Sequence, residues 1–218
     1  MATEDDSYVL DFFSGSASTA HAVIQQNLED NGTRKFIMVQ IPEETDAKSN
    51  ARKAGFRTIC EIGKERIRRA GKKIKEDSPL TTQELDTGFR VFKCDSSNMK
   101  DVYYNPAEYE PSLFTSLEDN IKEDRTSEDL LFQVMLDLGV LLSSKIEETT
   151  IAGKKVFNVE DNYLIACFDD NVTEEAITEI AKQKPYYFVM RDSSMANDSV
   201  ATNFEQIFAA YSPDTVRK

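Results

Sequence analysis

The chain has 218 residues, enough to bury a full hydrophobic core as one domain or two small ones. Its 39 acidic and 26 basic side chains give a formal charge of −13, which opposes contact of the whole surface with DNA phosphates. No apolar run approaches the roughly 20 residues that cross a bilayer, so we expect no membrane partner and a cytoplasmic location. One histidine and the dispersed Cys60, Cys94 and Cys167 predict reduced thiols and no metal site.

The first predicted elements are a strand, a tight turn and a helix. Tyr8 to Phe13 is a short apolar run typical of a buried strand, and residues 16–28 have apolar side chains at helical spacing. Between them, Gly15 lets the backbone bend, and the first helical N–H groups stay free to donate to a ligand. A dinucleotide fingerprint would also need glycines at positions 17 and 20. The alanines found there argue against NAD.

The stretch Asp11-Phe-Phe-Ser-Gly-Ser-Ala-Ser-Thr-Ala-His-Ala-Val23 resembles the S-adenosylmethionine-binding motif of amino-methylating DNA methyltransferases, commonly Asp-x-Phe-x-Gly-Ser-Gly-Thr-Thr. It is most similar to the modification subunits of type III restriction–modification systems, in which Thr-Ala-His-Ala-Val continues the motif. Ala17 departs from the pattern, which has a second glycine there, and we expect a tighter loop that weakens cofactor binding. The resemblance implies cofactor-binding roles for Asp11, Phe13, Ser14, Gly15, Ser16 and Ala17.

The second strand is predicted at Lys35 to Ile41, where nearly every side chain is apolar, as in an internal strand of a parallel sheet. In cofactor-binding α/β folds an acid just past the second strand accepts hydrogen bonds from the ribose hydroxyls. Glu43 is our candidate for this role, with Gln40 and Glu44 as alternatives. The competing interpretation of Glu43 is a solvated carboxylate in a turn.

A helical pattern from residue 46 is interrupted at Gly55 and resumes after Thr58, which is predicted to cap a helix that ends before a polar loop at residues 76–87. One side of this helix is apolar. The other side carries seven basic side chains between Lys64 and Lys75, which either follow a DNA backbone or form a solvated face. The stretch from Gly55 to Ala70 also resembles the same methyltransferase family.

Gly88 to Cys94 is predicted as a third strand, and Asp95 follows it. Open α/β sheets hold ligands at the carboxyl ends of their strands, and the resemblance implies that Asp95 lies near the adenine of the cofactor. From the sequence alone Asp95 is equally a turn residue. Residues 101–125 are predicted as a connector. Asn105-Pro-Ala-Glu-Tyr109 within it lacks the second proline of the Asn-Pro-Pro-Tyr motif, so we reject it as the motif that binds the flipped base.

Residues 126–218 are predicted to form a small α/β domain without catalytic spacing, in which the polar groups around 192 and 198 belong to loops. The elements expected there are a helix at 127–138, a hairpin of strands at 146–150 and 155–159, a strand at 163–168, a helix at 173–181, a strand at 185–190 and a helix at 203–211. Phrases in this part resemble the C-terminal end of the same modification subunits.

The resemblance therefore implies an α/β chain in which a partial Rossmann-like methyltransferase sheet (1–100) precedes the connector and the small C-terminal unit (126–218). It implies the C-terminal portion of a permuted, adenine-specific amino methyltransferase that uses S-adenosylmethionine. In type III subunits the Pro-Pro-Tyr motif and the target-recognition region precede the cofactor motif. We therefore expect that catalytic half to be absent here, no catalytic residue in this chain, and no activity from the chain alone.

The expected partners are DNA through the complete subunit, the missing N-terminal region, the restriction subunit and a second copy in a homodimer. The alternative function is a non-catalytic subunit-interaction module, because exposed sheet edges favour self-association.

Overall fold

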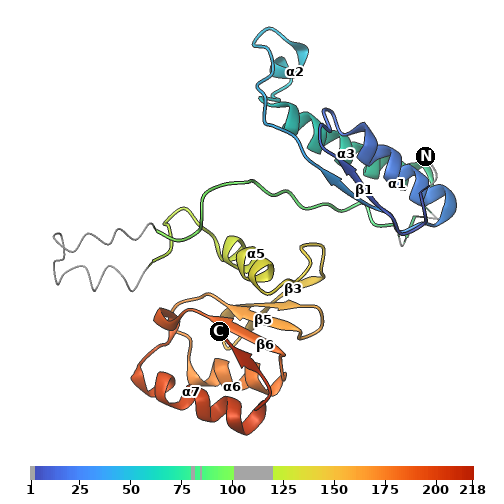
Figure 1. Ribbon diagram of the computed structural model, residues 1–218. Helices are drawn as coiled ribbons and strands as arrows, with labels where there is room; N and C mark the ends of the chain where they lie inside the picture. Colours follow the sequence, from blue (N-terminus) through green and yellow to red (C-terminus); the bar gives the residue numbers. More distant parts are fainter. Residues whose placement is uncertain (1–2, 80–81, 84, 101–119) are drawn as a thin grey trace. The chain divides into compact units, whose positions relative to one another are not determined.

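The computed structural model describes residues 3–79, 82–83, 85–100 and 120–218. The chain forms two compact units, Met1–Lys93 (unit 1) and Cys94–Lys218 (unit 2), each built of helices and strands (Figure 1). The predicted α/β class is confirmed. The Asn105-to-Tyr109 motif and most of the predicted connector at 101–125 lie outside the described residues. None of the helices in the described ranges is both long and apolar enough to cross a bilayer.

Unit 1 is built on β1 (Tyr8–Asp11) and β2 (Lys35–Met38), which pair in parallel and are joined by α1 (Ser18–Asp30). The short α2 (Asn50–Lys53) precedes α3 (Ile59–Asp77), which packs on α1. Helices α1 and α3 and the inner face of the strands share a small core. Its buried members are Ala17, Ala20, Ile24, Ile67 and Ile74, with Phe36 and Met38 packed against them.

The start of α3 is fixed by a capping box. The Thr58 hydroxyl accepts the Glu61 N–H, and the Glu61 carboxylate accepts the N–H groups of Thr58 and Arg57. These backbone donors, the one of Arg57 above all, hold the pKa of Glu61 below its usual range. The helix ends at Asp77, two residues beyond Lys75, the last residue predicted to lie on it.

Two predictions about the sheet of unit 1 are wrong. Residues 88–94 form no strand, because no described strand runs beside them to complete a ladder. Instead Phe89 packs into the core of the helices, and Arg68 lies over its ring at 5.6 Å. β2 is not internal, because β1 is its only neighbour among the described strands, and Ile37 on its outer face is 48% exposed.

Unit 2 has a mixed sheet with helices on both faces (Figure 1). The strands lie in the order β3 (Ile146–Ile151), β4 (Lys154–Val159), β5 (Leu164–Cys167), β6 (Tyr187–Met190) and β7 (Val216–Arg217). Pairing is antiparallel from β3 to β5 and parallel from β5 to β7. Strand residues alternate between a core under α6 (Glu174–Lys182) and α7 (Asp198–Tyr211) and a core under α5 (Ser127–Asp137).

The predicted hairpin and the strands and helices around it are present in unit 2, with shifts at their ends. The largest correction is at α7, which begins at Asp198 and not at residue 203. Asn197 caps it by accepting the Val200 N–H at 3.1 Å, so Asp198 lies in the first turn and not in a loop. Asp192–Ser194 forms a short 3-10 helix.

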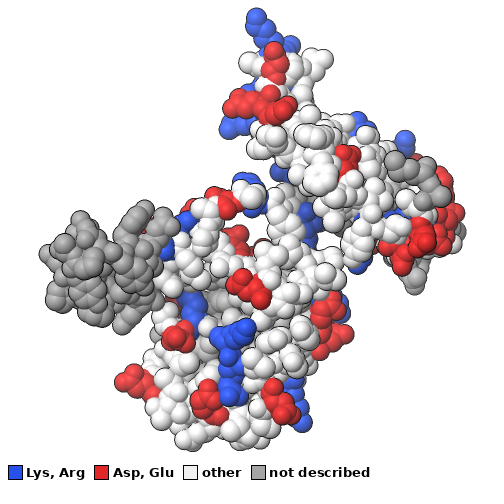
Figure 2. Space-filling view, viewed as in Figure 1, with Lys and Arg blue, Asp and Glu red and all other residues white. Residues whose placement is uncertain are grey.

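The two units differ sharply in charge balance. Unit 1 has 15 acidic and 15 basic side chains, whereas unit 2 has 24 acidic and 11 basic ones and so carries the entire net charge of −13. Both signs are interspersed on the face of the molecule shown in Figure 2. The repulsion of nucleic acid inferred from the sequence therefore applies to unit 2 and not to unit 1.

Candidate functional site

The loop between β1 and α1 is tied to the helix that follows it by Asp11. One carboxylate oxygen, Oδ1, accepts the Phe13 N–H at 3.2 Å, and Oδ2 accepts the Thr19 hydroxyl at 2.6 Å. Both oxygens of Asp11 are thus bound within the protein. Its role in the structure is to hold the turn and the first helical turn in one arrangement.

A second set of hydrogen bonds holds the loop to the end of β2. The Ser14 N–H donates to the Val39 carbonyl at 3.2 Å, and the Gly15 N–H donates to Gln40 Oε1 at 2.8 Å. Gly15 has a φ of +50°, a left-handed conformation that side chains rarely adopt. Gly15 therefore turns the chain where the Gln40 side chain can reach its backbone.

Helix α1 begins without a side-chain cap. Its N-cap is Ala17, and the N–H groups of Ser18, Thr19 and Ala20 donate to no acceptor within the described residues. The first turn of a helix without such acceptors presents N–H donors together with the positive end of the helix dipole. This edge of unit 1 has the chemistry to bind a carboxylate or another anionic group.

Ala17 has a left-handed φ of 59° and is only 2% exposed, so its methyl group lies inside the unit. Gly63 of α3 lies against it: a Cβ at residue 63 would be 3.4 Å from the Ala17 Cβ and 3.4 Å from the Gly15 carbonyl oxygen. Helix α3 comes this close to the loop because Gly63 has no side chain. The role of Gly63 was not predicted from the sequence, although a glycine on the apolar side of a predicted helix was a usable signal.

A reciprocal exchange tests this contact. Ala17→Gly combined with Gly63→Ala moves the methyl group from the loop to the helix. Replacing the left-handed alanine at position 17 and the helical glycine at position 63 each raises the free energy of unfolding by about 1 kcal/mol. Glycine at position 17 also gives the unfolded chain more freedom, which lowers the free energy of unfolding by up to about 1 kcal/mol. We expect the double variant to be about 1 kcal/mol more stable than the wild type in urea unfolding.

The matched control for the exchange is Gly71→Ala on the same helix. It has the same gain in helix propensity, but its Cβ would meet the Thr87 Cβ at 2.8 Å, so we expect no stabilisation. A double variant less stable than the wild type would contradict the packing of Ala17 on Gly63.

The polar side chains that follow β2 have different partners. Gln40 is bound to Gly15 and to the Ile41 carbonyl, and Glu44 forms an ion pair with Arg52 at 2.8 Å. The exposed carboxylate of Glu43 has no partner within the described residues. Its backbone carbonyl accepts the Ile59 N–H at 3.0 Å, which ties it to the start of α3. Of the three predicted candidates, Glu43 is the one whose side chain has no partner among the described residues.

The remaining predicted site residues differ in their exposure, and one of them belongs to unit 2. Ser14 is buried, Ser16 is half-buried, and Phe13 is 81% exposed on the surface of the loop. Asp95 belongs to unit 2, where it accepts the Ser96 N–H at 2.7 Å and lies 3.5 Å from Arg125. The bond from Ser96 and then the charge of Arg125 hold its pKa below the usual range. In unit 1 the structure thus joins Gln40 to the loop, and Glu43 follows three residues later, tied to the start of α3, whereas Asp95 belongs to unit 2.

The basic side of α3 borders a shallow hollow of about 350 Å³ that also involves α1. Its lining includes His21, Phe56, Arg66, Arg69 and Lys73. Arg69 is paired with Glu65 at 2.7 Å, whereas Arg66 and Lys73 have no ion-pair partner in the described ranges. His21 is half-buried at the edge of this hollow.

Comparisons with known proteins identify relatives in restriction–modification. No protein-family model matches the chain. The EcoP15I Mod subunit of Escherichia coli, a type III restriction–modification enzyme, is 32% identical over 210 residues, which are 94% of this chain and 29% of the relative. The StyLTI Mod subunit of Salmonella typhimurium is 44% identical over 93 residues, 43% of this chain and 14% of the relative.

A relative of a second type matches a shorter part. The type II methyltransferase M.KpnI of Klebsiella pneumoniae is 42% identical over 57 residues, 26% of this chain and 14% of the relative. The chain therefore spans less than a third of the length of each of these relatives.

Proposed function

We propose that unit 1 binds S-adenosylmethionine for a DNA methyltransferase. The premise is that this chain belongs to the family of type III restriction–modification Mod subunits. The observation that carries this proposal is the start of α1, which has no side-chain cap, beside a glycine turn; in the segment after the adjacent parallel strand β2, the Glu43 carboxylate has no partner among the described residues. β1, α1 and β2 would then be part of a Rossmann-like sheet.

The residues present fit the two ends of this cofactor. The N–H groups of residues 18–20 suit the carboxylate of its methionine part, and the Glu43 carboxylate suits the ribose hydroxyls. Asp11 and Gln40 act through the loop, because each is bound to its backbone or to α1. The role of Asp95 near the adenine stays a prediction of the family resemblance.

The cofactor supplies an activated methyl group, and the proposed acceptor is the exocyclic amine of adenine in a short DNA site. Such a transfer depends on holding the two reactants in line more than on a strong base. Unit 1 holds the cofactor in position for this transfer. We propose that the motif that binds the flipped base comes from a region outside this chain, so that the chain alone is inactive and DNA is bound by the complete subunit.

Any DNA contact made by this chain is assigned to the basic side of α3. Arg66 and Lys73 have no ion-pair partner among the described residues there, and unit 1 has no net charge to oppose them. Unit 2, with its charge of −13, is unsuited to phosphate. A restriction subunit and a second copy of the Mod subunit are the further proposed partners.

Replacing Glu43 tests the proposed ribose contact. A hydrogen bond from a hydroxyl to a charged group contributes about 1.5–3 kcal/mol, so we expect Glu43→Gln to weaken S-adenosylmethionine binding by about tenfold or more in isothermal titration. Glu44→Gln, one residue away, removes the same charge from a carboxylate that is paired with Arg52. The affinity of Glu44→Gln for S-adenosylmethionine should stay within about twofold of that of the wild type. Equal losses in the two variants would show a general charge effect and contradict the contact.

A subunit-interaction module is the second candidate function. The outer face of β1 and β2 exposes the apolar side chains of Tyr8, Leu10 and Ile37, at 48–57%. A monomer in analytical ultracentrifugation that also binds the cofactor would count against this candidate.

A further inference from the structure

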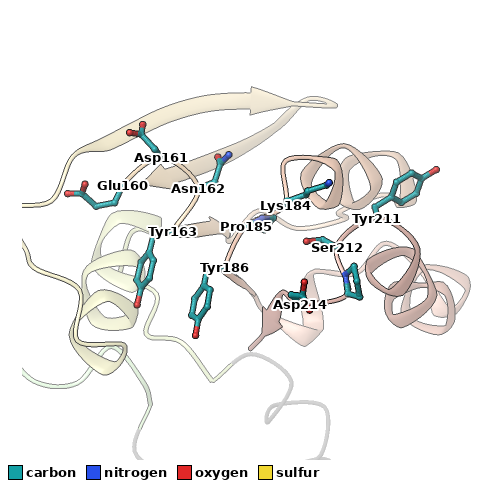
Figure 3. Close-up of a pocket in the computed structure, with 11 residues that line it drawn as sticks. Glu160, Asp161, Asn162, Tyr163, Lys184, Pro185, Tyr186, Tyr211, Ser212 and Asp214 are labelled. Atoms are coloured by element: carbon teal, nitrogen blue, oxygen red, sulfur yellow. The ribbon is translucent and has the colours of Figure 1, made fainter.

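Unit 2 contains an open hollow of about 690 Å³ that is separate from the proposed cofactor site. It lies where the loop between β4 and β5, the segment before β6 and the segment after α7 come together (Figure 3). Tyr163, Tyr186 and Tyr211 line it and are 41%, 54% and 44% exposed. Exposed tyrosines grouped around one hollow are typical of sites that bind another molecule.

The aromatic rings form an ordered group. Tyr163 and Tyr186 stack with ring centroids 5.4 Å apart and an interplanar angle of 4°, and their side chains extend side by side (Figure 3). Tyr187 packs edge-on against both, at 5.6 and 4.8 Å. The faces of neighbouring rings already attract cations in this unit: Lys182 lies over Tyr211 at 5.7 Å and Lys218 over Tyr187 at 5.9 Å.

The charged residues of the hollow are mainly acidic. Glu160, Asp161 and Asp214 line it, against the single cation Lys184. The Asp214 carboxylate has no ion-pair or hydrogen-bond partner within the residues that the structure describes. Together with the net charge of unit 2, these carboxylates attract cationic groups and repel phosphates.

Hydrogen bonds between the loops hold the hollow in shape. The Tyr186 N–H donates to the Asn162 carbonyl at 3.0 Å, and the buried Thr215 hydroxyl donates to the Pro185 carbonyl at 2.6 Å. Asn162 is bound in turn to Asn158 through two hydrogen bonds of 2.6 and 2.8 Å. A surface fixed in this way loses little conformational entropy when a partner binds.

We propose that this hollow binds an arginine-bearing segment of a protein partner. A guanidinium group is flat, so it stacks on a tyrosine face while its N–H groups donate to a carboxylate such as Asp214. The ammonium group of lysine provides the charge without the flat surface. The volume exceeds that of one side chain and suits a short peptide. Nucleobases also stack on tyrosines, but the acidic rim opposes the phosphates that accompany them.

The test is fluorescence anisotropy with the full chain and a fluorescein-labelled Gly-Arg-Gly-Arg-Gly-Arg-Gly peptide. Exposed cation–π contacts are worth about 0.5–1 kcal/mol each, so Tyr163→Leu with Tyr186→Leu should weaken binding by about fivefold or more. Tyr163→Phe with Tyr186→Phe keeps the rings and should stay within about twofold. The matching lysine peptide should bind about threefold more weakly than the arginine peptide.

The charge contribution has its own matched pair of variants. Asp214→Asn should weaken binding by about threefold in low salt. Glu175 lies in the first turn of α6, whereas the hollow is lined by Lys184, which follows the last turn. Glu175→Gln removes the same charge there and should change the affinity for the peptide only slightly. This pair decides the question even if the leucine variant does not fold.

Three results would overturn the proposal. The first is no binding of the arginine peptide at concentrations up to about 1 mM. The second is equal affinity in the wild type and in the leucine variant, or equal effects of Asp214→Asn and Glu175→Gln. The third is binding of a labelled oligothymidylate that the leucine variant loses, which would make the hollow a nucleic-acid site.

Discussion

Replacing Phe208 with alanine is expected to lower the free energy of unfolding of unit 2 by about 3–5 kcal/mol. Phe208 is fully buried under the sheet, stacked on Phe188 at 5.3 Å and packed against Phe204 at 5.2 Å. The three rings join α7 to β6, so the cavity left by alanine lies where helix and sheet meet. The rings cannot close it without moving the helix, which places the cost in the upper range for a core residue.

Urea unfolding followed by far-UV circular dichroism measures this loss in the transition that belongs to unit 2. Leu141→Ala serves as the control, because Leu141 is 65% exposed and its truncation should cost less than about 0.5 kcal/mol. A loss below about 1 kcal/mol for Phe208→Ala would contradict the described core of unit 2.

Gly15→Trp is expected to weaken S-adenosylmethionine binding at least 100-fold, to about the limit of detection. A side chain at a φ of +50° is strained, so we expect the indole to distort the loop that leads into the start of α1. The backbone would also shift away from Gln40, which binds the Gly15 N–H at 2.8 Å. Isothermal titration of the purified variant measures the effect.

Gly153→Trp is the matched control for this change. Gly153 lies in the hairpin between β3 and β4 with a φ of +76°, and no described atom beyond its chain neighbours would lie within 4 Å of a Cβ added there. A tryptophan there therefore causes the same kind of backbone strain, but in unit 2. The affinity of Gly153→Trp for the cofactor should equal that of the wild type. Unchanged binding in Gly15→Trp would remove the β1–α1 loop from the proposed site.

Local sequence signals predicted most elements of both units. Alternating and helical hydrophobic patterns located α1, α3, α6 and the β3–β4 hairpin, because each buries one face against a core that the structure contains. The loop around Gly15 was predicted from residue types alone, since a turn with a left-handed residue needs glycine. Glu43 was likewise chosen from its place after β2.

Features that depend on distant partners were not predictable in this way. Residues 88–94 have the composition of a strand, but a strand exists only where a second backbone lies beside it. The contact between Gly63 and Ala17 depends on how α3 packs on the loop, and a helical pattern does not show that. The grouping of Tyr163, Tyr186 and Asp214 joins three segments that together span about 50 residues of sequence, which no short motif contains.

Isothermal titration of the wild-type chain with S-adenosylmethionine tests the central claim most directly. We predict binding of one cofactor molecule per chain, with an affinity in the micromolar range that a fixed loop and one charged ribose contact provide. No heat of binding at cofactor concentrations up to about 1 mM would contradict a cofactor site in unit 1.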